Sequence, residues 1–180
     1  MSYYDDIKQK LLDNEIYSRV KDYSKERHKV ITYFEIGKIL NEVGGKYGDK
    51  IIEEYSKKLM SDVGKKYDKS TLFKIRKFYM VFSDKKVAPL VPQMTWSHCL
   101  ILIPMKDINK INYYINQILI RNLSRRQLVT IIKSKEYERL PEETKDKLIE
   151  REKTSVVDFV KNPIKIKNNN NYENILEKML

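Results

Sequence analysis

Apolar residues recur along most of the chain at the three- and four-residue spacing of an amphipathic helix, which predicts an all-α protein. The clearest stretch runs from Ile51 to Phe82. Its apolar residues keep this spacing up to Met60 and again from Leu72 onward, and Gly64 stands where a helix is expected to end in a left-handed conformation. We therefore expect two helices joined by a tight turn, within a multi-helix bundle.

The second helix of this pair is expected to turn an apolar face to the core and a basic face away from it. Asp68 or Ser70 is its expected N-cap, because short polar side chains accept hydrogen bonds from the first free backbone N–H groups. From Lys65 to Lys86 there are eight Lys and Arg against two Asp, a net +6 out of +11 for the whole chain. The basic residues opposite the apolar stripe are Lys69, Lys74, Arg76 and Lys77.

A helix, a short turn and a second helix with a basic outer face form the helix-turn-helix arrangement. In that arrangement the second helix enters the major groove of DNA. A plainer interpretation is a helical hairpin whose outer lysines only keep the protein soluble. The sequence pattern alone does not separate the two interpretations.

Further helices are expected on both sides of this pair. Their ranges are Tyr4–Tyr17, Val20–Val43, Thr95–Ile103 and Asp107–Ile120. Thr95 and Asp107 are the expected N-caps of the last two. Gly44 and Gly45 are expected to end the helix that begins at Val20. Within that helix, Gly37 is expected to let another helix approach closely, because glycine has no side chain.

A second basic surface is expected after the helix that ends near Ile120. Ser124, followed three residues later by Gln127, forms a capping box, which predicts that a new helix begins there. The basic residues of this helix are Arg125, Arg126 and Lys133. Whether the two basic surfaces share one side of the fold does not follow from the sequence. A single continuous stripe would favour DNA binding.

The composition favours a cytoplasmic protein with a polyanionic partner. No apolar run approaches the length of about 18 residues that indicates a membrane span, and the N-terminal residues lack the features of a signal peptide. Cys99 is the single cysteine, so no internal disulfide points to an oxidising compartment. With an isoelectric point near 9.5, clustered Lys and Arg favour a nucleic acid over a membrane surface.

The sequence has no motif expected of a metal, cofactor or small-molecule site. His28 and His98 do not have the spacing of zinc ligands, and no glycine-rich loop follows a strand. The Glu-x-Lys of residues 143–145 lacks the flanking strands that a metal-dependent nuclease needs. Glu35 is more simply explained as the partner of a lysine or arginine than as a catalytic carboxylate. His98 is more simply explained as a group that hydrogen-bonds a neighbouring carbonyl.

A series of short motifs resembles the N-terminal domain of the YhcG family, numbered 1016 among domains of unknown function. The resemblance covers the chain from about residue 15 to residue 140, and it rests on the order and spacing of the motifs. They are Tyr33–Lys38, Tyr47–Gly48, Ile52–Glu53 with Leu59, Leu72 with Arg76–Tyr79, Trp96–His98, Leu123–Leu128, Ile132–Ser134 and Tyr137–Leu140.

This resemblance implies a helix-turn-helix-like or winged-helix-like DNA-binding domain. In full-length members that domain precedes a nuclease domain of the restriction-endonuclease fold. We therefore expect residues 1–150 to form the helical DNA-binding domain, and residues 151–180 to form a linker and the start of a truncated or absent nuclease domain. Without the nuclease motif, the chain by itself is not expected to be an enzyme.

The leading hypothesis is a non-catalytic DNA-binding domain of a YhcG-type nuclease. Its expected DNA contacts are Lys69, Ser70, Lys74, Arg76 and Lys77 toward the groove or phosphates, and Arg125, Arg126 and Lys133 on the backbone. The alternative is a protein-interaction module that forms a homodimer or docks a nuclease domain through the Trp96 segment and the C-terminal helix. A standalone enzyme using Glu35 and His98 is a third hypothesis.

Overall fold

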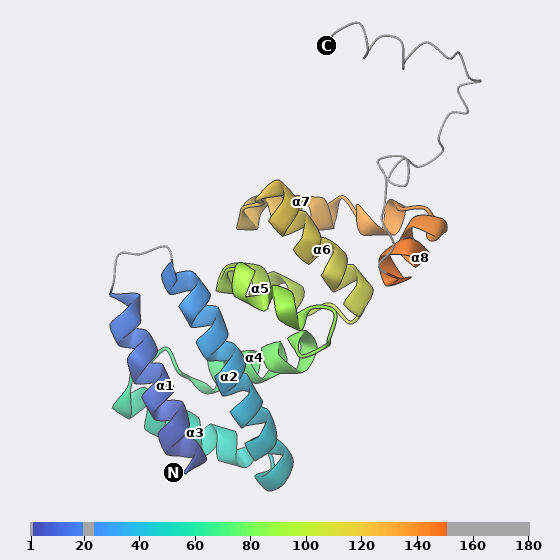
Figure 1. Ribbon diagram of the computed structural model, residues 1–180. Helices are drawn as coiled ribbons and strands as arrows, with labels where there is room; N and C mark the ends of the chain where they lie inside the picture. Colours follow the sequence, from blue (N-terminus) through green and yellow to red (C-terminus); the bar gives the residue numbers. More distant parts are fainter. Residues whose placement is uncertain (1, 20–23, 151–180) are drawn as a thin grey trace, which may run out of the picture. The chain divides into compact units, whose positions relative to one another are not determined.

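The computed structural model describes residues 2–19 and 24–150, with side chains up to residue 148. These residues form helices joined by turns, with no strand among them (Figure 1). The all-α fold is therefore confirmed. A winged helix also needs a β-hairpin, so the winged part of the expectation is not confirmed within the described residues. The linker and nuclease start expected at 151–180 lie outside them.

The described helices follow one another with short connections. In chain order they are α1 (Tyr3–Ser18), α2 (Ser24–Tyr47), α3 (Lys50–Asp62), α4 (Lys69–Phe82), the 3-10 helix η1 (Ala88–Gln93), α5 (Trp96–Leu102), α6 (Ile108–Arg121), α7 (Arg125–Lys133), the 3-10 helix η2 (Tyr137–Arg139) and α8 (Glu142–Glu150). The chain divides into two compact units after Ser134. The first unit contains α1 to α7, and the described part of the second contains η2 and α8.

The N-caps were predicted correctly. Asp68 caps α4 by accepting a hydrogen bond from the Thr71 N–H at 2.8 Å. Thr95 caps α5, and Asp107 caps α6. Each of these interactions is local in sequence, which is why the residue types alone predict them.

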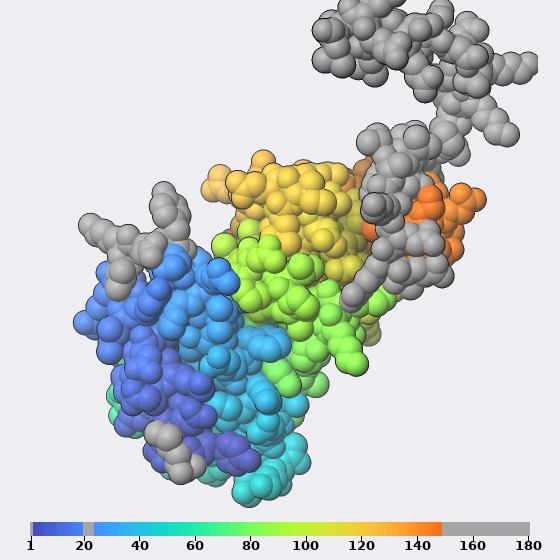
Figure 2. All heavy atoms as spheres, in the orientation of Figure 1, coloured from blue at the N-terminus to red at the C-terminus, as the bar shows by residue number. Residues whose placement is uncertain are grey.

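Helices α2 and α4 form the centre of the first unit. The apolar stripe of α4 is completely buried at Leu72, Ile75, Phe78 and Phe82. It packs against α2, and the Phe34 ring on α2 meets the Phe78 ring edge-on at a centroid distance of 5.8 Å. Helices α1 and α3 also pack against α2, and Figure 2 shows the atoms of α1 and α2 (blue) closely packed.

Helices α2 and α4 approach each other closely at Gly37. A Cβ atom placed on Gly37 would lie 2.5 Å from the Ile75 carbonyl oxygen and 2.7 Å from the Tyr79 Cβ. Both distances are shorter than van der Waals contact, and one of the atoms belongs to the backbone. The prediction that Gly37 allows another helix to approach is confirmed, and the helix is α4.

The sequence predicted that α2 ends at Gly44 and Gly45. The helix instead continues to Tyr47. A Cβ on Gly44 would meet the guanidinium carbon of Arg76 at 2.7 Å. Gly44 thus remains helical and makes room for a side chain of α4. The left-handed conformation belongs instead to Gly48, whose φ is 78°. The predicted start at Val20 lies outside the described residues.

The connection between α3 and α4 is held in place by Tyr67, which is completely buried. Its hydroxyl donates a hydrogen bond to the Glu15 carboxylate on α1 and also hydrogen-bonds the Tyr33 hydroxyl on α2. Burial raises the pKa of Tyr33 to about 12. Gly64 lies in this connection. The sequence predicted a left-handed conformation for it, but its φ is not positive. The N–H groups of Val63 and Gly64 both donate to the Leu59 carbonyl, at 2.9 and 3.0 Å.

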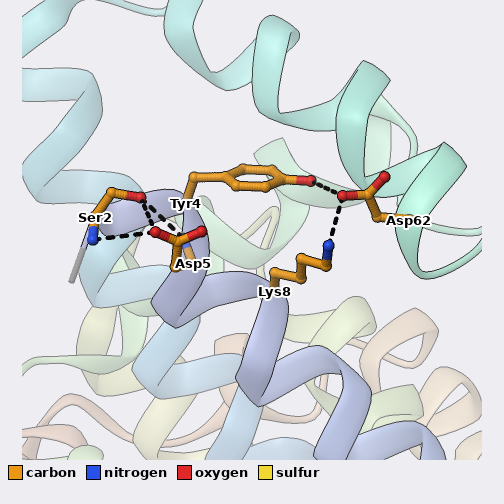
Figure 3. A network of polar contacts seen from close by, with 5 residues as sticks. All are labelled: Ser2, Tyr4, Asp5, Lys8 and Asp62. Carbon is orange, nitrogen blue, oxygen red and sulfur yellow. Dashed lines mark hydrogen bonds and ion pairs between the residues drawn. The ribbon is translucent and has the colours of Figure 1, made fainter.

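A polar network ties α1 to the end of α3 (Figure 3). The Asp62 carboxylate accepts hydrogen bonds from the Tyr4 hydroxyl and the Lys8 ammonium, both at 2.8 Å. Ser2 and Asp5 form a capping box at the start of α1. Such exposed ion pairs stabilise a fold only slightly. The network therefore fixes how α1 lies against α3 more than it adds stability.

In the second unit, a densely charged stretch of the sequence forms the helix α8. Lys145 pairs with Glu142 at 2.7 Å, and its ammonium lies 5.9 Å from the centre of the Tyr137 ring. The Glu-x-Lys of residues 143–145 is therefore helical, and it has no flanking strands within the described residues.

Candidate nucleic-acid interface

The outer face of α4 is a narrow stripe opposite the buried one. Ser70, Lys74 and Lys77 are exposed and follow one another at four- and three-residue spacing, so they point in one direction. Among the described residues, no carboxylate lies within ion-pair distance of Lys74 or Lys77. Both ammonium groups are therefore free to meet an anion from solution.

Two of the predicted contacts on α4 are already occupied. Lys69, at the start of the helix, pairs with Glu53 of α3. Arg76 is only 17% exposed and donates to the Asp49 carboxylate at 2.5 Å. Two residues along a helix correspond to a rotation of about 200°, which turns Arg76 away from Lys74. The prediction that Arg76 shares the outer face is wrong, because its side chain packs over Gly44 inside the first unit.

The basic residues predicted on α7 are all exposed. Arg125 and Arg126 occupy the first turn and Lys133 the last residue of the helix. No carboxylate of the described part of the chain pairs with any of the three. Leu128 is fully buried and anchors the helix. Both α4 and α7 pack against α5, which links the two basic helices.

The start of α7 is fixed by the capping box predicted from the sequence. The Gln127 N–H lies 3.4 Å from the Ser124 Oγ, and the Ser124 N–H donates to the Gln127 carboxamide oxygen at 2.8 Å. The residue before this box, Asn122, is left-handed with φ of 47°. The sequence analysis did not single out Asn122, although asparagine is one of the few residues that adopts this conformation readily.

His98 connects α5 to the turn before α7. It is buried, and its ring hydrogen-bonds the Leu123 backbone, as the sequence analysis expected of a neighbouring carbonyl. Its Nδ1 atom has no hydrogen-bond partner among the described residues. Burial lowers the pKa of His98, because the charged ring would lose its hydration.

We expect the stability of the protein to fall as pH is lowered through the range in which His98 would take up a proton. The unfolded chain binds this proton below a pKa of about 6.5, whereas the folded chain binds it only at lower pH, so acid favours unfolding. Urea unfolding followed by circular dichroism at pH 7.5 and 5.5 measures this loss. The loss should be smaller in His98→Gln, and an equal loss in both proteins would contradict this role.

The other residues singled out in the sequence, Glu35, Trp96 and Cys99, lie in structural surroundings. Glu35 forms an ion pair with Lys10 of α1 at 2.7 Å. Trp96 lies edge-on to the rings of Tyr33 and Phe78. Cys99 is buried, which raises the pKa of its thiol to about 12. Residues 2–19 and 24–150 bring together no group of three or more His, Cys, Asp or Glu side chains that could hold a metal ion.

None of the helices within the described ranges is both long enough and apolar enough to cross a membrane.

Comparison with protein families supports the resemblance drawn from the short motifs. The model of the DUF1016 N-terminal domain matches residues 14–139. The match spans α2 to η2 completely, and so includes both basic helices. Comparisons with curated proteins and with solved structures found no match to this chain. Because the family model covers more than half of the chain, the protein belongs to the family defined by the DUF1016 N-terminal domain.

Proposed function

We propose that this domain is a non-catalytic DNA-binding module. The observation that carries the proposal is the set of exposed cations without carboxylate partners in the described residues. These are Lys74 and Lys77 on α4, and Arg125, Arg126 and Lys133 on α7. They belong to helices whose other faces are anchored in the core by Leu72 and Leu128. Because the backbone of these helices is already ordered, only the side chains lose conformational freedom when they meet phosphates.

On α4, the presence or absence of an ion pair distinguishes Lys74 and Lys77 from the other two basic residues. Lys69 and Arg76 form ion pairs with α3 and the turn before it, which accounts for them as structural residues. Lys74 and Lys77 have no such role in the described structure, and burial does not explain them either. Repulsion among unpaired like charges disfavours folding slightly, so Lys74 and Lys77 do not stabilise the fold. Binding to an anionic partner would account for both residues.

The assignment as a module without its own catalysis rests on the family resemblance. In full-length members a nuclease domain follows the N-terminal domain, and that domain would supply the cleavage chemistry. The present chain would supply DNA affinity, with a nuclease domain or a second copy of the chain as a further partner. The alternative, a protein-interaction module built on the Trp96 segment, remains a prediction, and the packing of Trp96 on Tyr33 and Phe78 does not favour it.

Charge reversal on α4 tests this proposal. Lys74→Glu combined with Lys77→Glu should weaken binding to a fluorescent duplex of about 20 base pairs at least about tenfold at low salt, because two phosphate contacts become repulsive. Fluorescence anisotropy measures the affinity, and an unchanged far-ultraviolet circular dichroism spectrum shows that the fold survives.

The matched control is Lys38→Glu combined with Lys57→Glu. This variant makes the same change in net charge at exposed positions of α2 and α3. It should lose only the small, general electrostatic share of the affinity. Equal losses in the two double variants, or no loss in the α4 variant, would reject the assignment of α4 as a contact surface.

A further inference from the structure

The connection between α6 and α7 fits a helix-turn-helix better than the connection between α3 and α4. Three residues (122–124) separate α6 from α7, whereas six (63–68) separate α3 from α4. The turn of a helix-turn-helix has about three or four residues. Figure 1 shows the chain turning sharply between α6 and α7, so that the two helices lie at an angle.

Each residue of the shorter turn has a defined structural role. Asn122 adopts the left-handed conformation that ends α6. Leu123 is buried, and its N–H donates to the Ile118 carbonyl at 3.1 Å. Ser124 forms the capping box of α7. From α5, His98 bonds the Leu123 backbone, so a third helix holds the turn in place. Helix α5 therefore contacts the turn between α6 and α7, and it also packs against α7.

A larger part of α7 than of α4 is exposed, and the exposed residues of α7 include arginines as well as a lysine. Leu128 is the fully buried residue of α7, whereas the apolar stripe of α4 is buried over its whole length. The exposed face of α7 carries Arg125, Arg126 and Thr130. Arginine pairs with the two acceptor atoms of guanine through a planar fork, which the point charge of a lysine ammonium does not reproduce as specifically.

The partial charge of the helix N-terminus also bears on the role of the two arginines that begin α7. A helix N-terminus carries partial positive charge, so cations in the first turn disfavour the helix. Arg125 and Arg126 occupy the first two positions of α7 and have no carboxylate partner in the described residues. They therefore do not serve the stability of α7. The N-terminal residues of a recognition helix are the ones that reach base edges.

We propose that α7, and not α4, is the helix that enters the major groove of double-stranded DNA. Arg125 and Arg126 contact base edges, with guanine as the preferred base, and Lys74 and Lys77 of α4 contact phosphates. This inference rests on the proposed DNA-binding function and assigns a different task to each basic helix.

Selection of bound sequences from a random duplex pool tests the division of tasks. The intact chain should enrich a sequence containing guanine. Lys74→Ala with Lys77→Ala should bind more weakly but enrich the same sequence. Arg125→Lys with Arg126→Lys keeps the charge and removes the planar fork, so it should retain the salt dependence of binding while its preference for guanine falls at least about tenfold.

The possible failures are distinct. If the intact chain binds no duplex, the proposed function and this inference both fall. If it binds duplex DNA without sequence preference, the proposed function stands and the reading role of α7 is rejected. A changed sequence preference in the α4 variant, together with an unchanged one in the α7 variant, would return the reading role to α4.

Discussion

Gly37→Ala should unfold at a markedly lower denaturant concentration than the unchanged protein, with a loss of about 2–3 kcal/mol in the free energy of unfolding. The added methyl group would lie 2.5 Å from the Ile75 carbonyl oxygen and 2.7 Å from the Tyr79 Cβ. Neither atom is at the free end of a flexible side chain, so α2 and α4 must move apart. Alanine favours a helix by about 1 kcal/mol over glycine, and the clash must exceed that gain.

Gly45→Ala is the matched control for Gly37→Ala. Gly45 lies in the same helix, and a Cβ placed on it would meet no atom within 4 Å. Here only the helix preference and the unfolded-state entropy change, so stability should rise by up to about 1 kcal/mol. Urea unfolding monitored by circular dichroism compares the two variants. If Gly37→Ala proves as stable as Gly45→Ala, α2 and α4 do not approach as closely as described.

Tyr67→Ala should destabilise the protein by about 3–5 kcal/mol, the usual cost of deleting a fully buried aromatic side chain. The Tyr67 ring is completely inaccessible, and its hydroxyl joins Glu15 of α1 to Tyr33 of α2. Its backbone carbonyl also accepts a hydrogen bond from Ser56 of α3 at 3.3 Å. The substitution therefore loosens the connection that places the first turn of α4.

Two further variants separate the contributions of Tyr67. Tyr67→Phe keeps the ring and removes the hydroxyl, so it should cost about 1–3 kcal/mol through lost hydrogen bonds. Tyr47→Ala removes a tyrosine that is 60% exposed, and it should change stability by no more than about 0.5 kcal/mol. Thermal or urea unfolding gives all three values. Similar results for Tyr67→Ala and Tyr47→Ala would contradict the buried position of Tyr67.

Local features of the fold were predictable because their causes lie within a few residues. Asp68 and Ser124 cap helices through backbone groups three residues away, and the spacing of apolar residues identified the buried stripe of α4. Gly37 was also recognised, because a glycine among helical apolar residues indicates close packing. The packing partner, α4, was not predictable, since the sequence does not tell which helix approaches.

Features that depend on distant residues were not predictable in the same way. Gly44 follows the expected pattern of a helix end, but it is helical, and its missing side chain leaves room for the guanidinium of Arg76, far along the chain. The assignment of Arg76 to the outer face of α4 conflicts already with helical spacing, which turns it about 200° from Lys74. Its ion pair with Asp49, however, depends on a residue of another part of the fold. A helical stripe gives only the approximate direction of a long side chain, and tertiary ion pairs decide the rest.

The candidate site was predictable as a set of residue types but not as an arrangement. The sequence identified both basic helices and the capping box of α7. It drew attention to the longer connection before α4, because that connection contains glycine and lysines. The tighter turn before α7 depends on Asn122 adopting a left-handed conformation and on His98 reaching Leu123 from another helix. Neither the left-handed conformation of Asn122 nor the contact between His98 and Leu123 leaves a periodic signal in the sequence.

The most direct test of DNA binding is the salt dependence of affinity for a duplex, measured by fluorescence anisotropy between about 50 and 300 mM salt. Neutralising each phosphate contributes a slope of about −0.9 to the logarithm of affinity against the logarithm of salt concentration. Phosphate contacts by Lys74, Lys77 and Lys133 predict a slope of about −2.7, which would reach about −4.5 if Arg125 and Arg126 also neutralise phosphates. Absence of binding at about 50 mM salt, or an affinity independent of salt, would contradict the proposed function.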